Sequence, residues 1–288
     1  MRRTYKNDAG ISVRYQKVKK DHIRLRLGIF LALAMLLLLG ALFARQLCPY
    51  DPNLQDYSNA LQPPSLAHPF GTDRFGRDML SRVIMGGQVS IFSTLILVAV
   101  ITVFGTGVGV VCGYAEGLTD GVVMRICDVC LAFPGLVFAL AVAALLGGGI
   151  QNAVIALAVV SWPKYARIAR SQTLTLKNSD FIYASRLAGC RGWQIILRHI
   201  LPNILGQIVV TAVLDMGTMM MELAGLSFLG LGAMPPTAEW GSMMSSGRSM
   251  IQTYSWVVIT PGIGIFVSVA VFNLLGDTFR DYLDKKIR

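Results

Sequence analysis

The sequence predicts an all-α integral membrane protein with six transmembrane helices and both termini in the cytoplasm. Three observations lead to this prediction. First, 54% of the 288 residues are hydrophobic and 15% are charged, whereas roughly a quarter of a soluble domain is charged. Second, several stretches are free of charge and approach or exceed the about 20 apolar residues that a spanning helix needs. Third, 20 of the 26 lysines and arginines fall in three segments that this topology places on one side.

The basic residues cluster in residues 1–26, 164–198 and 280–288, which hold nine, seven and four of them. Cytoplasmic segments of membrane proteins carry an excess of Lys and Arg, so six spans explain all three clusters. The net charge of +10 therefore reflects topology, and nucleic-acid binding is not expected. Residues 1–26 are expected to form a basic cytoplasmic tail near anionic headgroups.

Apolar runs define the six predicted spans. They cover residues 27–44, 83–115, 122–146, 150–168, 199–214 and 249–276. The first transmembrane helix occupies residues 27–46. We expect it to be retained, because its apolar run of 18 residues is long for a signal peptide and no small-residue cleavage site follows. An external segment at 47–82 and a five-helix core at 83–288 complete the predicted organisation.

Two segments are predicted to lie at the external face. Residues 47–82 are rich in proline, glycine and alternating charge, which predicts an ordered loop. Arg77, Asp78 and Arg82 are expected to pair with one another where the chain enters the membrane. Residues 225–249 are too apolar for a free loop and are expected to form a re-entrant or interfacial element.

Glycine and proline positions predict the packing of the helices. Gly105, Gly109 and Gly113 recur every four residues on one helix face, where a neighbouring helix can approach closely. Pro134 with Gly135 predicts a bend in the third span, and Pro163 predicts one at the end of the fourth.

Catalysis by this chain is not expected. The sequence contains no Gly-Lys-Ser or Gly-Lys-Thr, so the phosphate-binding loop of nucleotide hydrolases is absent. The three histidines fall in three different regions, and no Ser-His-acid constellation is apparent. Cys127 and Cys130 have metal-ligand spacing, but no second pair completes a tetrahedral site, so they are interpreted as core residues.

The helix of the fifth span, continued beyond its charge-free stretch at 199–214, contains the candidate substrate-path residues. Asp215 and Glu222 are seven residues apart, hence on one helix face, with Met219 between them and Met220 beside it. Carboxylate oxygens and thioether sulfurs make these four residues candidates for a passing site for a divalent cation or its chelate, with Asp215 and Glu222 as tentative metal ligands. The alternative is that Asp215 bonds a neighbouring helix and the methionines pack.

The basic loop at 171–202 is the best indication of function. It contains Tyr183-Ala184-Ser185, then Arg186 and Gly189, and it closes on Leu201-Pro202. This amphipathic segment resembles the "EAA" signature of the permeases of bacterial ABC importers. In that family the loop is a coupling helix that inserts into a partner ATPase. Tyr183 replaces the usual acidic residue and Ser185 the second alanine, so Arg186 or Arg191 would supply charge there.

The resemblance extends over nearly the whole chain and indicates a subfamily. Phe70-Gly71-Thr72-Asp73-(x2)-Gly76-Arg77-Asp78 and residues 225–232 resemble the second, C-type permease of the peptide/nickel importers. Within that subfamily, the motifs at 184–187, 214–220 and 236–241 look most like nickel permeases. The resemblance thus implies transport of nickel or a metal chelate, with import of dipeptides or oligopeptides as the alternative. A proton-coupled secondary carrier, with Asp215 and Glu222 as proton relay, is more remote.

The resemblance also implies partners. A type I importer permease forms a heterodimeric pore with a sister permease in the bacterial inner membrane. Two cytoplasmic ABC ATPase subunits bind ATP and magnesium, and an extracellular or periplasmic solute-binding protein delivers the cargo. No cofactor is expected in this chain itself.

Overall fold

The computed structural model describes residues 5–6, 12–13 and 20–287, with side chains for residues 23–283. Strands β1 (Tyr5–Lys6) and β2 (Ser12–Val13) pair antiparallel. The remainder of the predicted tail up to residue 19 lies outside the described residues. The first helix begins at Lys20, so it includes seven residues that were predicted to belong to the tail.

Helices make up most of the described chain. They are α1 (Lys20–Leu42), α2 (Ala44–Leu47), α3 (Met79–Ala115), α4 (Gly117–Ala132), α5 (Gly135–Leu145), α6 (Ile150–Lys177), α7 (Asp180–Leu187), α8 (Gly192–Ile195), α9 (Leu201–Phe228), α10 (Trp240–Gly247) and α11 (Trp256–Ile287). Single turns are 3₁₀ at Tyr57–Asn59 and Arg248–Met250 and π-helical at Ile196–Ile200.

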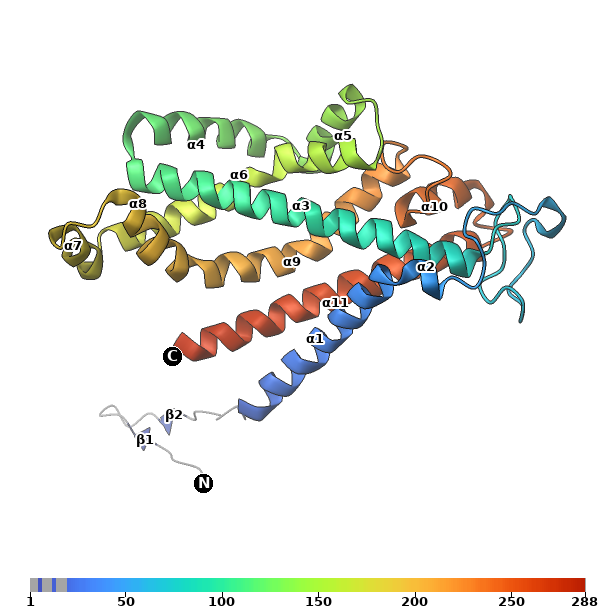
Figure 1. The fold of residues 1–288 in the computed structure, drawn as a ribbon, viewed down its shortest axis with the longest axis horizontal. Coiled ribbons are helices and arrows are strands. Elements are labelled where there is room, and N and C mark those ends of the chain that lie inside the picture. Colours follow the sequence, from blue (N-terminus) through green and yellow to red (C-terminus); the bar gives the residue numbers. More distant parts are fainter. Residues whose placement is uncertain (1–4, 7–11, 14–19, 288) are drawn as a thin grey trace.

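The long helices run back and forth between two ends of the molecule (Figure 1). In chain order, α1, α3, the α4–α5 pair, α6, α9 and α11 alternate in direction. The loop with α7 and α8 lies at one end, and the start of α1 and the end of α11 point toward it. Helices α2 and α10 and the preceding external segment lie at the opposite end.

The number of membrane-spanning helices agrees only in part with the prediction. By length and composition, α1, α3, the stretch Gly192–Phe228 and α11 can each cross a membrane. The α4–α5 pair is a fifth candidate if it forms one broken span, bent by 96°. This bend lies at Pro134 and confirms the predicted kink. Helix α6 is not among these candidates, and it carries four basic residues along its length.

Several helices extend beyond the apolar runs that define the predicted spans. Helix α3 begins at Met79 instead of residue 83, because the Asp78 carboxylate accepts hydrogen bonds from the Ser81 backbone N–H and hydroxyl at 2.8 and 2.7 Å. Helix α6 continues through Pro163 to Lys177, and α9 continues past residue 214 to Phe228.

The glycine face of α3 packs against α6, as predicted. A Cβ atom on Gly105 would lie 2.5 Å from the carbonyl oxygen of Trp162, and one on Gly113 would lie 2.9 Å from that of Arg170. At Gly109 the added atom would overlap the carbonyl oxygen of Ala166. Backbone-to-backbone contact of this kind maximises van der Waals attraction between helices in lipid.

The external segment is ordered, but its predicted ion pairs are wrong. Arg77 pairs with Asp73 at 2.7 Å, and Arg82 lies 3.6 Å from the same carboxylate. Asp78 bonds His68 Nδ1 at 2.9 Å instead. The chain can bring Arg77 back onto Asp73 because Gly76 adopts a positive φ of 73°, packed on the Asp56 backbone where no Cβ fits.

The single cysteine expected at the external face, Cys48, is held at the end of α2. Its thiol donates a hydrogen bond to the Ser81 carbonyl at 3.3 Å. Burial, and then the nearby Asp78 and Asp51 carboxylates, raise the pKa of this thiol. It is therefore a poor nucleophile at neutral pH.

Residues 225–249 complete α9 and form α10 at the same end of the molecule. Glu239 caps α10, because its carboxylate accepts hydrogen bonds from the backbone N–H groups of Gly241 and Ser242 at 2.9 and 2.8 Å. The Trp240 indole donates to the Val83 carbonyl of α3 at 2.8 Å. Helix α10 is thus packed against α3, and its expected re-entrant or interfacial position in the membrane stays a prediction.

Candidate functional site

Helix α7 lies at one end of the molecule (Figure 1) and carries several exposed apolar side chains. Its Ile182 side chain is fully buried, whereas Phe181, Tyr183 and Leu187 are 42%, 47% and 91% exposed. Ala184 is exposed as well. One face therefore anchors the helix and the other presents apolar surface to whatever lies beyond, which is typical of a binding surface.

Gly189 ends α7 in a left-handed conformation with φ of 84°. The Cys190 N–H donates to the Ser185 carbonyl at 3.1 Å, and the Gly189 N–H donates to that of Arg186 at 3.0 Å. These bonds satisfy the free carbonyls at the helix end. A Cβ atom on Gly189 would have no other atom within 4 Å, so this corner is open.

The base of α7 is fixed to the rest of the chain on two sides. The Ser185 hydroxyl donates to the Phe181 carbonyl at 2.8 Å and lies 3.4 Å from His199 Nε2, in the π-helical turn before α9. The Lys177 ammonium donates to the Tyr114 carbonyl at 2.7 Å, at the end of α3. The Arg186 guanidinium lies 5.8 Å from the Tyr114 ring centroid.

The second half of the predicted loop extends this surface. Leu201 is half-buried and Pro202 is exposed, at the first two positions of α9. Trp193 and Leu197, which sequence reasoning did not single out, are 56% and 54% exposed. Their four-residue spacing is the signal that indicates a shared helical face.

The basic residues of α6 form a ladder of ion pairs with acids from other segments. Lys164 bonds Asp215 of α9 at 2.6 Å, and Arg170 bonds Asp120 of α4 through two bonds of 2.5 Å. Arg167 pairs with Asp128 of α4, which also lies 3.8 Å from Arg125 of the same helix. Lys177 pairs with Glu116 at 3.0 Å. Helix α6 leads directly into α7, so the ladder connects that loop to α4 and α9.

Asp215 is bound to α6 from two sides and is 3% exposed. Besides the Lys164 bond, it accepts a hydrogen bond from the Tyr165 hydroxyl at 2.9 Å. This geometry matches the alternative in which Asp215 bonds a neighbouring helix. Met219 and Met220 are also buried, and Glu222 is half-buried.

The exposed methionine of this region is Met221, which sequence reasoning missed. It is 56% exposed and lines an apolar groove of about 480 Å³ with Phe228, Met244 and Phe266. The sequence-based candidates were chosen from the helix face that carries Asp215 and Glu222, and Met221 was not among them. Among residues 23–283, no group of three or more His, Cys, Asp or Glu side chains is arranged to hold a metal ion.

If the chain transports a substrate, as the resemblance implies, replacing Asp215 with asparagine is expected to slow that transport more than it lowers assembly. The amide keeps the shape and accepts hydrogen bonds but removes the charge opposite Lys164, whose side chain is 48% exposed. We expect a loss of about 1 kcal/mol in stability, read from thermal melting of the purified complex, together with reduced uptake. Asp128→Asn is the matched control, because this carboxylate is 49% exposed and should cost less than about 0.5 kcal/mol. Equal effects on uptake from the two variants would contradict a special role for Asp215.

Comparisons with known proteins agree with this geometry. Residues 105–288 match the family described as binding-protein-dependent transport system inner membrane component. The chain is 44% identical over 275 residues to the glutathione transport system permease protein GsiD of Escherichia coli O6:K15:H31 (strain 536 / UPEC), covering 95% of this chain and 90% of the relative. GsiD of Shigella boydii serotype 4 (strain Sb227) gives the same identity and coverage.

A solved structure shares the fold. The methionine ABC transporter MetNI, in inward-facing conformations, aligns with a TM-score of 0.58 at 20% sequence identity. The alignment covers 71% of this chain and 97% of that one. At this identity the likeness concerns the fold alone.

Proposed function

The chain belongs to the family of binding-protein-dependent transport system inner membrane components, and we propose that it forms half of the pore through which a small peptide such as glutathione enters the cell. It is a multi-pass permease subunit of a bacterial ABC importer in the inner membrane and is not itself catalytic. The observation that carries the peptide proposal is the 44% identity, over 95% of this chain, to a permease named for glutathione transport.

This relative favours the peptide alternative over nickel, so the preference for nickel or a metal chelate drawn from short motifs is not supported. A physical reason lies in one of those motifs, at 236–241. Its Glu239 caps α10 and its Trp240 bonds the α3 backbone. Residues with such structural partners report on packing and carry little information about cargo.

The proposed topology has six crossings with both termini in the cytoplasm. The alternating directions of α1, α3, the α4–α5 pair, α6, α9 and α11 support it (Figure 1). In this arrangement α6 is a span whose basic residues are neutralised by ion pairs with acids of neighbouring segments, which lowers the cost of placing them at membrane depth. The end with α7 then faces the cytoplasm, where positive charge is favoured.

The proposed mechanism couples α7 to the pore. Two ABC ATPases bind ATP and magnesium in the cytoplasm. One of them binds the exposed face of α7, which contains Phe181, Tyr183 and Leu187. Closure of the ATPases displaces α7 and with it α6, and the ion pairs of α6 transmit the displacement to α4 and α9. The pore, completed by a sister permease, thereby switches between two packed states. A solute-binding protein delivers the cargo at the opposite end.

Reconstitution tests the proposal directly. The chain is combined in proteoliposomes with its sister permease, both ATPases and the binding protein, and uptake of radiolabelled glutathione and of ⁶³Ni²⁺ is measured. We expect glutathione to accumulate only when ATP is supplied on the ATPase side, and nickel to remain at background. Nickel uptake without glutathione uptake would restore the metal alternative. Uptake by this chain alone without ATP would identify a secondary carrier.

A further inference from the structure

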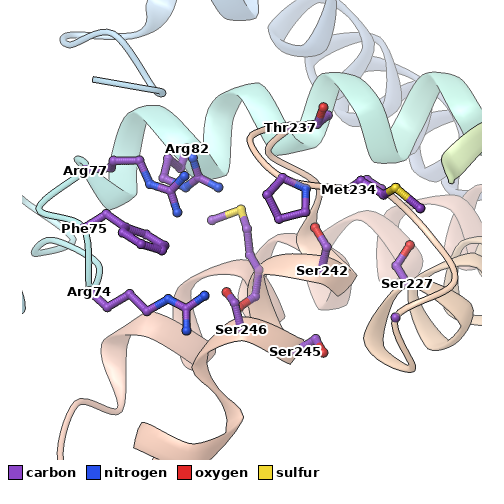
Figure 2. Close-up of a pocket in the computed structure, with 14 residues that line it drawn as sticks. Arg74, Phe75, Arg77, Arg82, Ser227, Met234, Thr237, Ser242, Ser245 and Ser246 are labelled. Carbon is purple, nitrogen blue, oxygen red and sulfur yellow. The ribbon is translucent and has the colours of Figure 1, made fainter. Parts of the chain in front are cut away.

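A cavity of about 250 Å³ lies at the end of the molecule opposite α7 (Figure 2). The last residues of the external segment, the start of α3, the end of α9 and α10 with its preceding loop enclose it. Its lining contains three arginines, Arg74, Arg77 and Arg82, and no acidic residue. We call it the arginine pocket. The arginines lie on one side of it, and Ser227 and Ser242 lie on the other (Figure 2).

The positive charge of this pocket is only partly compensated. Arg77 and Arg82 are 6% and 5% exposed and share one carboxylate, that of Asp73, at 2.7 and 3.6 Å. Arg74 forms no ion pair with any acid of residues 23–283. Nearby carboxylates are engaged elsewhere: Asp78 binds His68, and Glu239 caps α10. Arg77 and Arg82 are thus two buried positive charges beside one negative charge, although Arg82 also donates a hydrogen bond to the Pro52 carbonyl at 2.9 Å, and Arg74 adds a third, exposed charge. This excess of positive charge favours an anion.

The donors on the two sides of the pocket are held in place. The guanidinium carbons of Arg74 and Arg77 each lie 4.6 Å from the centroid of the Phe75 ring, which restricts both side chains. Across the pocket, the Ser227 hydroxyl is buried in a residue that is 2% exposed. It has no hydrogen-bond partner among the described residues. Such an orphan group costs free energy unless a ligand completes it.

We propose that the arginine pocket binds a carboxylate of the transported peptide as the peptide leaves the binding protein. This inference rests on the proposed function and specifies its substrate as an anionic peptide. A guanidinium matches the planar geometry of a carboxylate and binds it with charge-assisted hydrogen bonds, and a hydroxyl adds one more donor. The Asp73–Arg77–Arg82 cluster fixes the walls. Arg74, which is exposed and forms no ion pair with any acid of residues 23–283, makes the contact with substrate.

Binding of radiolabelled glutathione to the complete transporter in nanodiscs, without binding protein, tests the pocket. Arg74→Gln should weaken binding about tenfold, as expected for one charge-assisted contact. Arg45→Gln removes the same charge from exposed α2 at the same end and should have little effect. Ser227→Ala should weaken binding without lowering the melting temperature, because the lost hydroxyl has no partner in the protein. Succinate should compete, and glutathione with both carboxyl groups esterified should not.

The outcomes separate this inference from its alternatives. If Arg74→Gln and Ser227→Ala both bind glutathione like the wild type, or if the ester competes as well as glutathione, the pocket does not bind a substrate carboxylate. If Arg74→Gln instead weakens only the docking of substrate-free binding protein, the carboxylate belongs to that protein and the inference is overturned. Succinate binding that depends on Arg74, together with no glutathione uptake in proteoliposomes, would retain the anion site and reject the proposed cargo.

Discussion

Replacing Gly189 with arginine is expected to abolish ATP-driven uptake while the chain remains folded in the membrane. A side chain at φ of 84° costs on the order of 1 kcal/mol, and nothing within 4 Å obstructs it, so the fold tolerates the change. The corner beside α7 nevertheless gains a long cationic side chain where the ATPase is proposed to bind. Loss of a central interface contact costs about 2–4 kcal/mol, which corresponds to a reduction in coupling of at least about thirtyfold.

The matched control is Gly147→Arg. Gly147 lies between α5 and α6, away from α7, with φ of 85° and likewise no atom within 4 Å of an added Cβ (Figure 1). It imposes the same backbone strain and the same charge, so uptake and co-purification of the ATPase should survive. Transport in proteoliposomes and the amount of ATPase retained on the purified permease are the two measurements. Normal values for Gly189→Arg in both would remove α7 from the coupling surface.

The second large effect is expected from Gly109→Leu, which should prevent α3 and α6 from packing. Even the first carbon of the new side chain would overlap the Ala166 carbonyl oxygen, and this backbone atom cannot rotate away. The helices would have to separate over the whole glycine face, at a cost of at least about 3 kcal/mol. We expect little folded complex after size-exclusion chromatography and a lower melting temperature for what remains.

Gly107→Leu supplies the control for this change within the same helix. Gly107 is exposed and has no atom within 4 Å of an added Cβ. The same leucine there adds the same hydrophobicity and helix propensity without touching α6, so the yield should match the wild type. A Gly109→Leu complex as stable as the Gly107→Leu complex would show that the α3–α6 contact is not as close as described.

Local patterns in the sequence were enough for those features that depend on neighbouring residues. The glycine face of α3 follows from a four-residue repeat, and the bend between α4 and α5 follows from Pro134. The amphipathic character of α7 follows from the mixture of apolar and polar residues in Asp180–Leu187, and the structure buries one of these apolar side chains and exposes others. Each of these patterns is complete within one or two helical turns.

Features that join distant parts of the chain were not predictable in the same way. Lys164 and Asp215 are 51 residues apart, and Arg170 and Asp120 are 50 apart, so no local window relates them. The same limit explains the external ion pairs. Arg82 reaches Asp73 because Gly76 reverses the chain, whereas sequence proximity suggested Asp78. The arginine pocket likewise combines residues 74–82 with residues 227–246, about 150 positions later.

The ion-pair ladder of α6 has a consequence for how the protein is made. During synthesis, α6 leaves the ribosome before α9, so Lys164 reaches the membrane without Asp215. In the proposed topology α6 crosses the membrane. Arg167 and Arg170 can already pair with α4, whereas Lys164 stays unpaired, and a spanning segment with an unpaired cation inserts poorly on its own. We therefore expect α6 to insert stably into the bilayer only after α9 has been synthesised, so that the insertion of one segment depends on the other.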